Sequence, residues 1–295
     1  MSDIRRKATE IIRGHKAMDG AGVHLTRVLG IKTTNSFDPF LILDGFDSHN
    51  PEDYIKGFPW HPHRGIETVT YLIDGAMDHG DSLGNKGSIL AGGVQWMSAG
   101  SGIIHQEMPQ ASQHMLGCQL WVNLPRKDKM SEPSYGDIVA SDVPKVEEPN
   151  AVVRVIAGNY KGTKGGFAPK YVQVTYLDVA LKPGETWEYN GTANNETLFT
   201  YLFSGEMAVN EALDQMEHKG CAILYSASNE NKEECETVRI KAGAEGARFA
   251  LFAAEPLREP IAWGGPVVMN TRQELEQAFD EMDRGTFIKD NAAMV

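Results

Sequence analysis

The chain has 295 residues, 41% of them hydrophobic and 23% charged, and a formal net charge of −12 at pH 7. Because phosphate groups are bound by clustered Lys and Arg, this acidic balance disfavours direct contact with nucleic acid. No apolar run approaches the roughly 18 residues of a membrane span, and the first residues lack the apolar segment of a secretory signal. The three cysteines form no CxxC pair, which favours a reducing, cytoplasmic compartment.

Short apolar runs predict an all-β fold. Residues 66–73 are rich in Val, Thr, Ile and Tyr, and residues 115–124 alternate apolar side chains on one face. Further strands are predicted at residues 152–156, 171–181 and 248–253. Glycine-containing turns separate these runs, so we expect a sandwich or barrel rather than βαβ units.

One helix is predicted near the end of the chain. Thr271 and Glu274 form a capping box, in which each side chain satisfies a backbone amide of the other residue. Apolar residues follow at helical spacing, and Gly285 stands where a C-terminal cap is expected. We therefore expect an amphipathic helix that closes the chain on a sheet.

The sequence predicts two domains. Residues 125–150 are rich in Pro and charge and poor in apolar periodicity, which is typical of a linker. A boundary there divides the chain into residues 1–137 and 138–295. The segments TYLIDGAM, at residues 70–77, and TYLFSGEM, at residues 200–207, match at five positions. Such an internal match indicates a duplicated β domain.

Two short pairs of polar residues are the main candidates for a functional site. His61 and His63 are two residues apart, and so are His105 and Glu107. In a strand, residues at this spacing point to the same side. If the two pairs lie on neighbouring strands of one barrel, they bring together three imidazoles and one carboxylate.

This donor set predicts a metal site in the first half of the chain. A single HxH pair is more often ordinary core or surface histidine, but two such pairs beside β-prone runs favour a metal. Imidazole and carboxylate suit iron, manganese, nickel, copper or cobalt at least as well as zinc. His79 and His114 lack a partner at useful spacing and are expected at the surface or around the ligands. Gly191 and Ala193 align with the histidine pair, so the second half offers no equivalent.

Two longer stretches resemble a known family. GxxxHPHRGxETVTY, at residues 57–71, and GVQWMSAGSGIIHQEMP, at residues 93–109, closely resemble the two signature stretches of the pirin family, a branch of the bicupin superfamily. The resemblance extends more loosely over residues 19–30, 38–46 and 265–287. It implies two cupin-type β-barrel domains (double-stranded β-helices), of which only the first holds a metal.

The resemblance also implies which residues are ligands. Carried over residue by residue, the pirin pattern makes His61, His63, His105 and Glu107 the metal ligands. Glu67 stands where most other cupins have their glutamate ligand, and the pirin pattern excludes it. The implied cofactor is one mononuclear divalent metal, with Fe(II) as the first candidate and Mn, Ni, Co, Cu or Zn as alternatives.

Two functions follow from the resemblance, because several pirins look like quercetin 2,3-dioxygenases and animal relatives are described as iron-dependent transcriptional co-regulators. The first is an enzyme that opens a flavonol-like ring with O2, with Glu107 as the catalytic base. The second is an iron-binding regulatory protein that acts through a protein partner. A cupin isomerase with a sugar-like substrate is a weaker third reading. We expect a monomer in each case.

Aromatic residues flank both histidine pairs. Phe58, Trp60, Trp96 and Met97 are candidates for the wall of an aromatic pocket, with the barrel core as the alternative for each. Arg64 follows the second histidine and, by alternation, is expected to point away from the metal. We expect Arg64 to have a structural role, in a salt bridge at the barrel surface.

Overall fold

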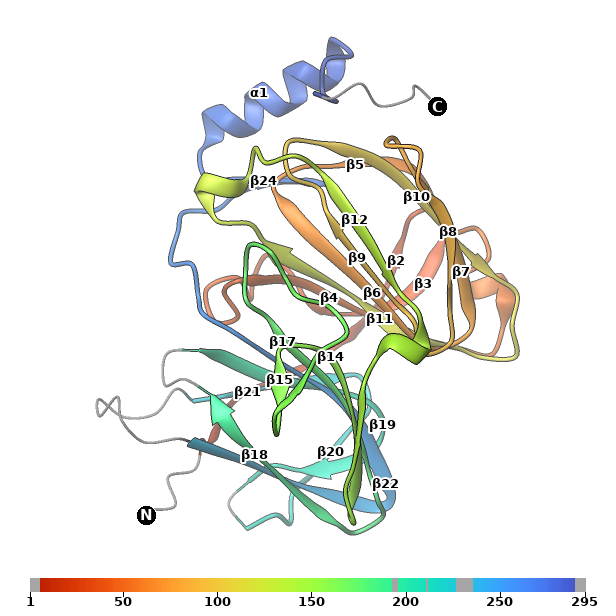
Figure 1. Cartoon of the computed structure of the whole chain (residues 1–295), viewed down its shortest axis with the longest axis vertical. Coiled ribbons are helices and arrows are strands. Elements are labelled where there is room, and N and C mark those ends of the chain that lie inside the picture. The colour runs from red at the N-terminus through yellow and green to blue at the C-terminus, as the bar shows by residue number, and fades with distance from the viewer. Residues whose placement is uncertain (1–5, 193–195, 211, 227–235, 290–295) are drawn as a thin grey trace. The chain divides into compact units, whose positions relative to one another are not determined.

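The computed structural model describes residues 6–192, 196–210, 212–226 and 236–289 (Figure 1). This part of the chain contains 24 strands and one α-helix, which confirms the all-β prediction. It forms two compact units. The first unit comprises Lys16–Thr34, Phe40–Ala140 and Leu257–Val295, and the second comprises Met1–His15, Asn35–Pro39 and Ser141–Pro256.

The units are therefore discontinuous in sequence. The prediction was two continuous halves, residues 1–137 and 138–295, and the main junction does fall close by, at Ala140 and Ser141. The last segment, Leu257–Val295, nevertheless belongs to the first unit. The reason is backbone pairing, because Arg64 forms a parallel bridge with Val267.

Two large antiparallel sheets form most of the first unit. The seven-stranded sheet has the order β12 (Ser134–Ile138), β9 (Val94–Ser98), β6 (Ile66–Asp74), β11 (Met115–Asn123), β4 (Phe40–Ser48), β3 (Val23–Leu29) and β2 (His15–Asp19). The four-stranded sheet has the order β5 (Phe58–His63), β10 (Ile103–Gln110), β7 (Ala76–Asp81) and β8 (Lys86–Leu90).

Strand alternation decides which side chains of the first unit face inward. Along β10, Ile103, His105, Glu107 and Pro109 are buried, while the residues between them are more exposed. One apolar cluster of the core comprises Val23, Leu25, Phe46, Tyr54, Leu72, Met77, Ile89 and Met115. Another comprises Leu41, Ile66, Met97, Ala99, Ile103 and Val268.

A sharp corner separates the histidine pair from the strand that follows it. The pair lies on β5, a strand of its own, and not at the start of the predicted strand 66–73, which is β6. Gly65 turns the corner with φ +78°, and a Cβ atom there would lie 2.0 Å from the carbonyl oxygen of Val268. Both the left-handed backbone and the close approach require glycine.

The predicted linker is largely ordered structure. Within residues 125–150 the chain forms 3-10 turns at Arg126–Asp128 and Ala140–Asp142, strand β12, and strand β13 (Lys145–Glu147). Strand β12 pairs with β9, and β13 pairs with β14 (Ala151–Ala157). The prediction was wrong here because edge strands are held by backbone hydrogen bonds and need no long apolar run.

The second unit contains one nine-stranded sheet. Its order is β1 (Ala8–Arg13), β21 (Cys221–Tyr225), β19 (Thr197–Ala208), β22 (Glu236–Ala254), β17 (Thr175–Leu181), β14 (Ala151–Ala157) and β13, with β18 (Thr186–Thr192) on β22 and β20 (Met216–His218) on β19. A short hairpin of β15 (Asn159–Tyr160) and β16 (Thr163–Lys164) follows β14. Buried Tyr160, Trp187 and Tyr189 stack at the centre of this unit.

The predicted helix is present as α1 (Arg272–Asp283) in the first unit, after the hairpin of β23 (Ala262–Gly264) and β24 (Val267–Met269). The Thr271 side chain accepts from the Glu274 amide at 3.2 Å, and the Glu274 carboxylate accepts from the Thr271 amide at 2.8 Å. Gly285 follows the helix with φ +68°. Both predicted caps are thus confirmed. No helix in the ranges given above is long and apolar enough to cross a membrane.

Candidate metal centre

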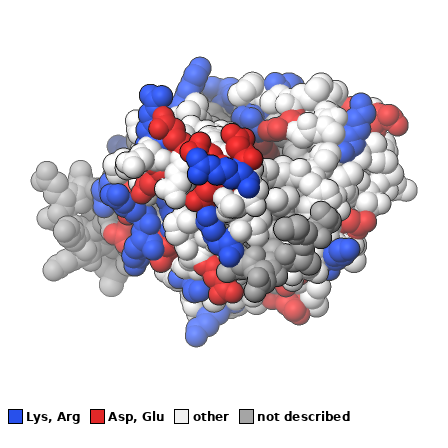
Figure 2. Space-filling model, turned by 90° about the horizontal axis from the view of Figure 1, so that it is seen from above, with Lys and Arg blue, Asp and Glu red and all other residues white. Residues whose placement is uncertain are grey.

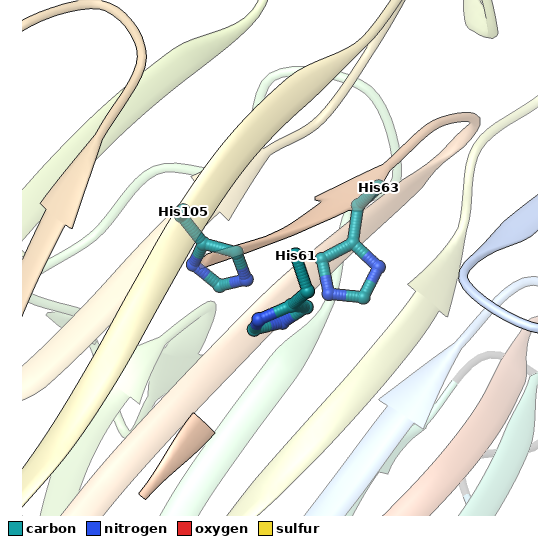
Figure 3. A group of neighbouring side chains, drawn as sticks. All are labelled: His61, His63 and His105. Carbon is teal, nitrogen blue, oxygen red and sulfur yellow. The ribbon is translucent and has the colours of Figure 1, made fainter. Parts of the chain in front are cut away.

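Three imidazoles converge inside the first unit (Figure 3). Strands β5 and β10 pair antiparallel, with His105 opposite His61 and Ile103 opposite His63. Ring nitrogens of the three histidines all lie within 4.8 Å of one another. The ring centroid of His105 is 4.3 Å from that of His61 and 5.0 Å from that of His63. The structure therefore brings together three of the four predicted ligands.

The ring nitrogens are arranged as metal ligands require. Nδ1 of His61 lies 2.8 Å from the carbonyl oxygen of Pro59, and Nδ1 of His63 lies 3.2 Å from that of Pro266. Because a carbonyl only accepts, each Nδ1 carries the proton and each Nε2 keeps its lone pair. Nε2 of His105 is buried and has no hydrogen-bond partner within the described part of the chain. A divalent metal would satisfy all three nitrogens, so the donor set fits one.

Burial also keeps two of these rings, those of His63 and His105, in the neutral form that binds metals. Burial, assisted by the neighbouring His61, lowers the pKa of His63 to about 3. Burial, assisted by three neighbouring histidines, lowers the pKa of His105 well below its usual value. Both imidazoles are therefore neutral near pH 7, and a metal binds them without displacing a proton.

Glu107 lies in the same interior but outside the histidine group. It is buried, and its carboxylate accepts hydrogen bonds from Gln119 Nε2 at 2.9 and 2.8 Å and from Thr70 Oγ1 at 2.9 Å. The ladder between β5 and β10 shifts register between His105 and Glu107. The sequence did not point to Thr70 or Gln119, because only the pairing of β6 with β11 brings them to this carboxylate.

Glu67 faces the other way. Thr70 reaches Glu107 in the interior, and a residue three positions earlier on a strand points to the opposite face. Glu67 is buried there, and this burial raises the pKa of its carboxyl to about 7 despite a hydrogen bond from Trp96. The corner at Gly65 thus separates Glu67 from the three histidines.

A cavity of about 710 Å³ opens on His61 and His63. Its apolar walls include Ile42, Phe58, Trp60, Trp121 and Trp263. The Trp121 ring stands edge-on to the His63 ring at a centroid distance of 4.8 Å. A flat aromatic ligand fits such walls, because large apolar side chains with a few polar groups are typical of small-molecule sites.

Two of the four predicted wall residues line this cavity, namely Phe58 and Trp60. Trp96 and Met97 do not, and both are buried in the core on β9. For these two, the core alternative is the right one. Trp263 could not be predicted as a wall residue, because it is more than 140 positions from Trp121 in the sequence and only the fold brings the two ring centroids to 6.1 Å.

One wall of the cavity is charged. Arg27 donates two hydrogen bonds to Asp44, at 2.9 and 2.7 Å, and one to Asp19 at 2.7 Å. Although partial burial alone would raise the pKa of Asp19, Arg27 and the Gly20 amide lower it below its ordinary value. The cavity therefore presents the ionised carboxylate of Asp19 as well as aromatic rings.

Two antiparallel β units, with a histidine cluster inside the first, define a bicupin protein with a metal-type site. The Pirin family model matches residues 22–122, and the Pirin C-terminal cupin domain model matches residues 176–288. The chain therefore belongs to the pirin family, and the two cupin-type domains predicted from the sequence are confirmed.

Several relatives span nearly the whole chain. A pirin-like protein of Caulobacter vibrioides is 43% identical over 285 residues, which cover 96% of this chain and 99% of that protein. Pirin of Homo sapiens is 36% identical over 276 residues, covering 92% and 91%. A crystal structure of quercetin 2,3-dioxygenase from Acinetobacter baumannii superposes with a TM-score of 0.83 at 30% identity, covering 98% of this chain and 100% of that one.

Proposed function

We propose that this protein is a metal-dependent dioxygenase that opens the ring of a flavonol-like substrate with O2. The observation that carries the proposal is the convergence of three imidazoles, of which His61 and His63 line a cavity that also includes three tryptophans. The likeness to the Acinetobacter quercetin 2,3-dioxygenase over the full chain supports the same activity.

We propose one mononuclear divalent metal, held by His61, His63, His105 and Glu107, with Fe(II) as the first candidate. Nitrogen and carboxylate donors of this kind suit iron and its first-row neighbours. When bound, such a metal supplies Lewis acidity, which lowers the pKa of a coordinated hydroxyl. The substrate hydroxyl would then give up its proton near neutral pH.

Glu107 is the proposed acceptor of that proton. Gln119 donates to both of its oxygens and also lines the cavity, so this amide connects the carboxylate with the substrate space. Thr70 also donates to this carboxylate, at Oε1, and helps to fix it. Trp121 and Trp263 provide flat apolar faces on which an aromatic ring stacks while water is excluded.

The charged wall predicts a preference among substrates. Asp19 accepts hydrogen bonds from phenolic hydroxyls, and a hydrogen bond to a charged group contributes about 1.5–3 kcal/mol. We expect Asp19→Asn to raise KM about tenfold for quercetin, with little change for a flavonol whose outer ring carries no hydroxyl. Asp78→Asn is the control, because Asp78 is an exposed carboxylate that does not line the cavity. Equal effects on both substrates would contradict a role in recognition.

The activity itself is tested by metal analysis followed by O2 uptake with a panel of flavonols. We expect the Fe(II)-loaded protein to consume one O2 per flavonol, and the chelated protein to consume none. Stoichiometric metal without O2 uptake on any flavonol would overturn the enzyme proposal. That result would favour the alternative, an iron-binding regulatory protein with a protein partner.

Two further features support a cytoplasmic protein that does not bind nucleic acid. On the face drawn in Figure 2, acidic and basic side chains are interspersed, without the continuous positive surface that phosphate binding requires. Cys118 and Cys221 are buried thiols, which is in keeping with a reducing compartment.

A further inference from the structure

The C-terminal segment of the first unit, defined as residues 263–287, contacts the backbone that carries His63. The carbonyl oxygen of Pro266 accepts from Nδ1 of His63 at 3.2 Å and from the amide of Arg64 at 3.4 Å. The amide of Val268 donates back to the carbonyl of Arg64 at 3.1 Å. Nδ1 of His61, by contrast, is hydrogen-bonded to the carbonyl oxygen of Pro59, which lies on the same strand.

A buried arginine stabilises this contact. The Arg64 side chain is almost fully buried, and it donates to the carbonyl oxygens of Ser101 at 2.6 Å and Phe287 at 2.9 Å. Its guanidinium lies 4.2 Å from the centroid of the Phe287 ring and pairs with Glu281 of α1 at 2.7 Å. The expectation of a salt bridge at the barrel surface is wrong: the Arg64 side chain is buried, and its partner is the partly buried Glu281 on α1.

A buried lysine forms a second set of hydrogen bonds that holds the C-terminal segment in place. Nζ of Lys129 donates to the carbonyl oxygens of Gly65 and Val268, both at 2.9 Å, and to Oδ1 of Asn123 at 2.6 Å. Three acceptors match the three N–H groups of an ammonium. Lys129 thus links Gly65, the residue that follows Arg64, to the C-terminal segment.

The ion pair between Arg64 and Glu281 stays charged over the whole working pH range. Although burial alone would raise the pKa of Glu281, hydrogen bonds from Lys289, Gln277 and Arg64 lower it to about 2. Removing this carboxylate leaves the Arg64 cation buried with only carbonyl oxygens and one aromatic ring around it. A buried charge without its counter-charge is strongly unfavourable, so the segment would be held less tightly.

We propose that the C-terminal segment is a positioning element of the metal centre, coupled to His63 through Arg64. The Pro266 carbonyl fixes the tautomer and the direction of the His63 ring, and the buried Arg64 and Lys129 hold that carbonyl in place. Because coupling between two sites is reciprocal, a bound metal also stabilises the docked segment. The inference rests on the metal site proposed above.

One matched pair of substitutions on α1 tests the coupling. Glu281→Gln removes the partly buried partner of the buried Arg64, whereas Glu276→Gln removes the same charge from an exposed pair with Arg272 on the same helix. We expect Glu281→Gln to weaken Co²⁺ binding about tenfold, as loss of a group that orients a ligand does. We expect Glu276→Gln to change it less than about twofold, as for an exposed ion pair.

Competition with a chelator measures the Co²⁺ affinity, and the visible absorption of bound Co²⁺ reports the ligand geometry independently of activity. A changed Co²⁺ spectrum in Glu281→Gln, partly restored in Glu281→Asp, supports positioning of His63. An unchanged affinity and spectrum in a folded Glu281→Gln protein would overturn it.

Hydrogen exchange of the unaltered protein gives a second test that needs no substitution. We expect Co²⁺ to slow exchange at the amide of Val268 as well as in strands β5 and β10. Slowing confined to β5 and β10 would overturn the coupling while leaving the metal site intact. If the unaltered protein binds no Co²⁺, both the proposed site and the inference that rests on it fail.

Discussion

Replacing His105 with alanine is expected to abolish stabilisation of the protein by metal. Nε2 of His105 is buried without a hydrogen-bond partner in the described part of the chain, and its ring lies close to those of both histidines of β5. A metal at a thousandfold excess over its Kd stabilises a folded protein by about 4 kcal/mol. The His105→Ala variant should lose most of this stabilisation by metal. Without metal, the variant should be destabilised far less, because the ring that it loses is itself a buried group without a hydrogen-bond partner at Nε2 in the described part of the chain.

The measurement is the free energy of unfolding with and without metal, together with metal per protein after dialysis. His79→Gln is the matched control, because His79 is also a buried histidine of the first unit but hydrogen-bonds with Tyr135 and Asp137. His79→Gln should cost stability equally with and without metal and should keep the metal. Loss of metal in His79→Gln, with retention in His105→Ala, would contradict the assignment.

Much of this site was predictable because its geometry is local. Two residues separated by one position share a face on any strand, so the pairs at His61 and His63 and at His105 and Glu107 could be read from the sequence. The caps of α1 at Thr271 and Gly285 are local for the same reason. In each case the physical cause lies within a few residues of the motif.

The rest depends on contacts between distant parts of the chain. Period-two alternation indicates that the Trp121 side chain points to the other face of its strand from Cys118 and Leu120. It does not reveal that the Trp121 ring contacts the ring of His63. Nothing near Trp263 or Pro266 indicates that these residues wall the cavity and orient a histidine. The same limit explains the domain boundary, because the pairing of Arg64 with Val267 assigns the chain end to the first unit.

The two buried glutamates of the first unit, Glu67 and Glu107, provide the sharpest test of the proposed ligand set. The pirin pattern assigns the carboxylate ligand to Glu107, whereas most cupins have it at the position of Glu67. Glu107 shares the inner face of β10 with His105, while Glu67 lies on the face of β6 opposite to Thr70, which contacts Glu107. Both side chains are about 1% exposed, so burial alone does not distinguish them.

We expect Glu107→Ala to weaken metal binding by more than about 100-fold, beyond the roughly 10–100-fold loss that follows from removing a group around the ligands. Glu67→Ala should leave the metal affinity within about tenfold, although both substitutions leave a cavity that costs stability. Metal per protein across a graded chelator series separates the two effects, with the unfolding free energy of each metal-free variant measured alongside. Glu107→Gln keeps an oxygen donor but no base, so it should lose more O2 uptake than metal. If Glu67→Ala empties the site while Glu107→Ala retains the metal, the general cupin arrangement holds and the carboxylate ligand proposed here is wrong.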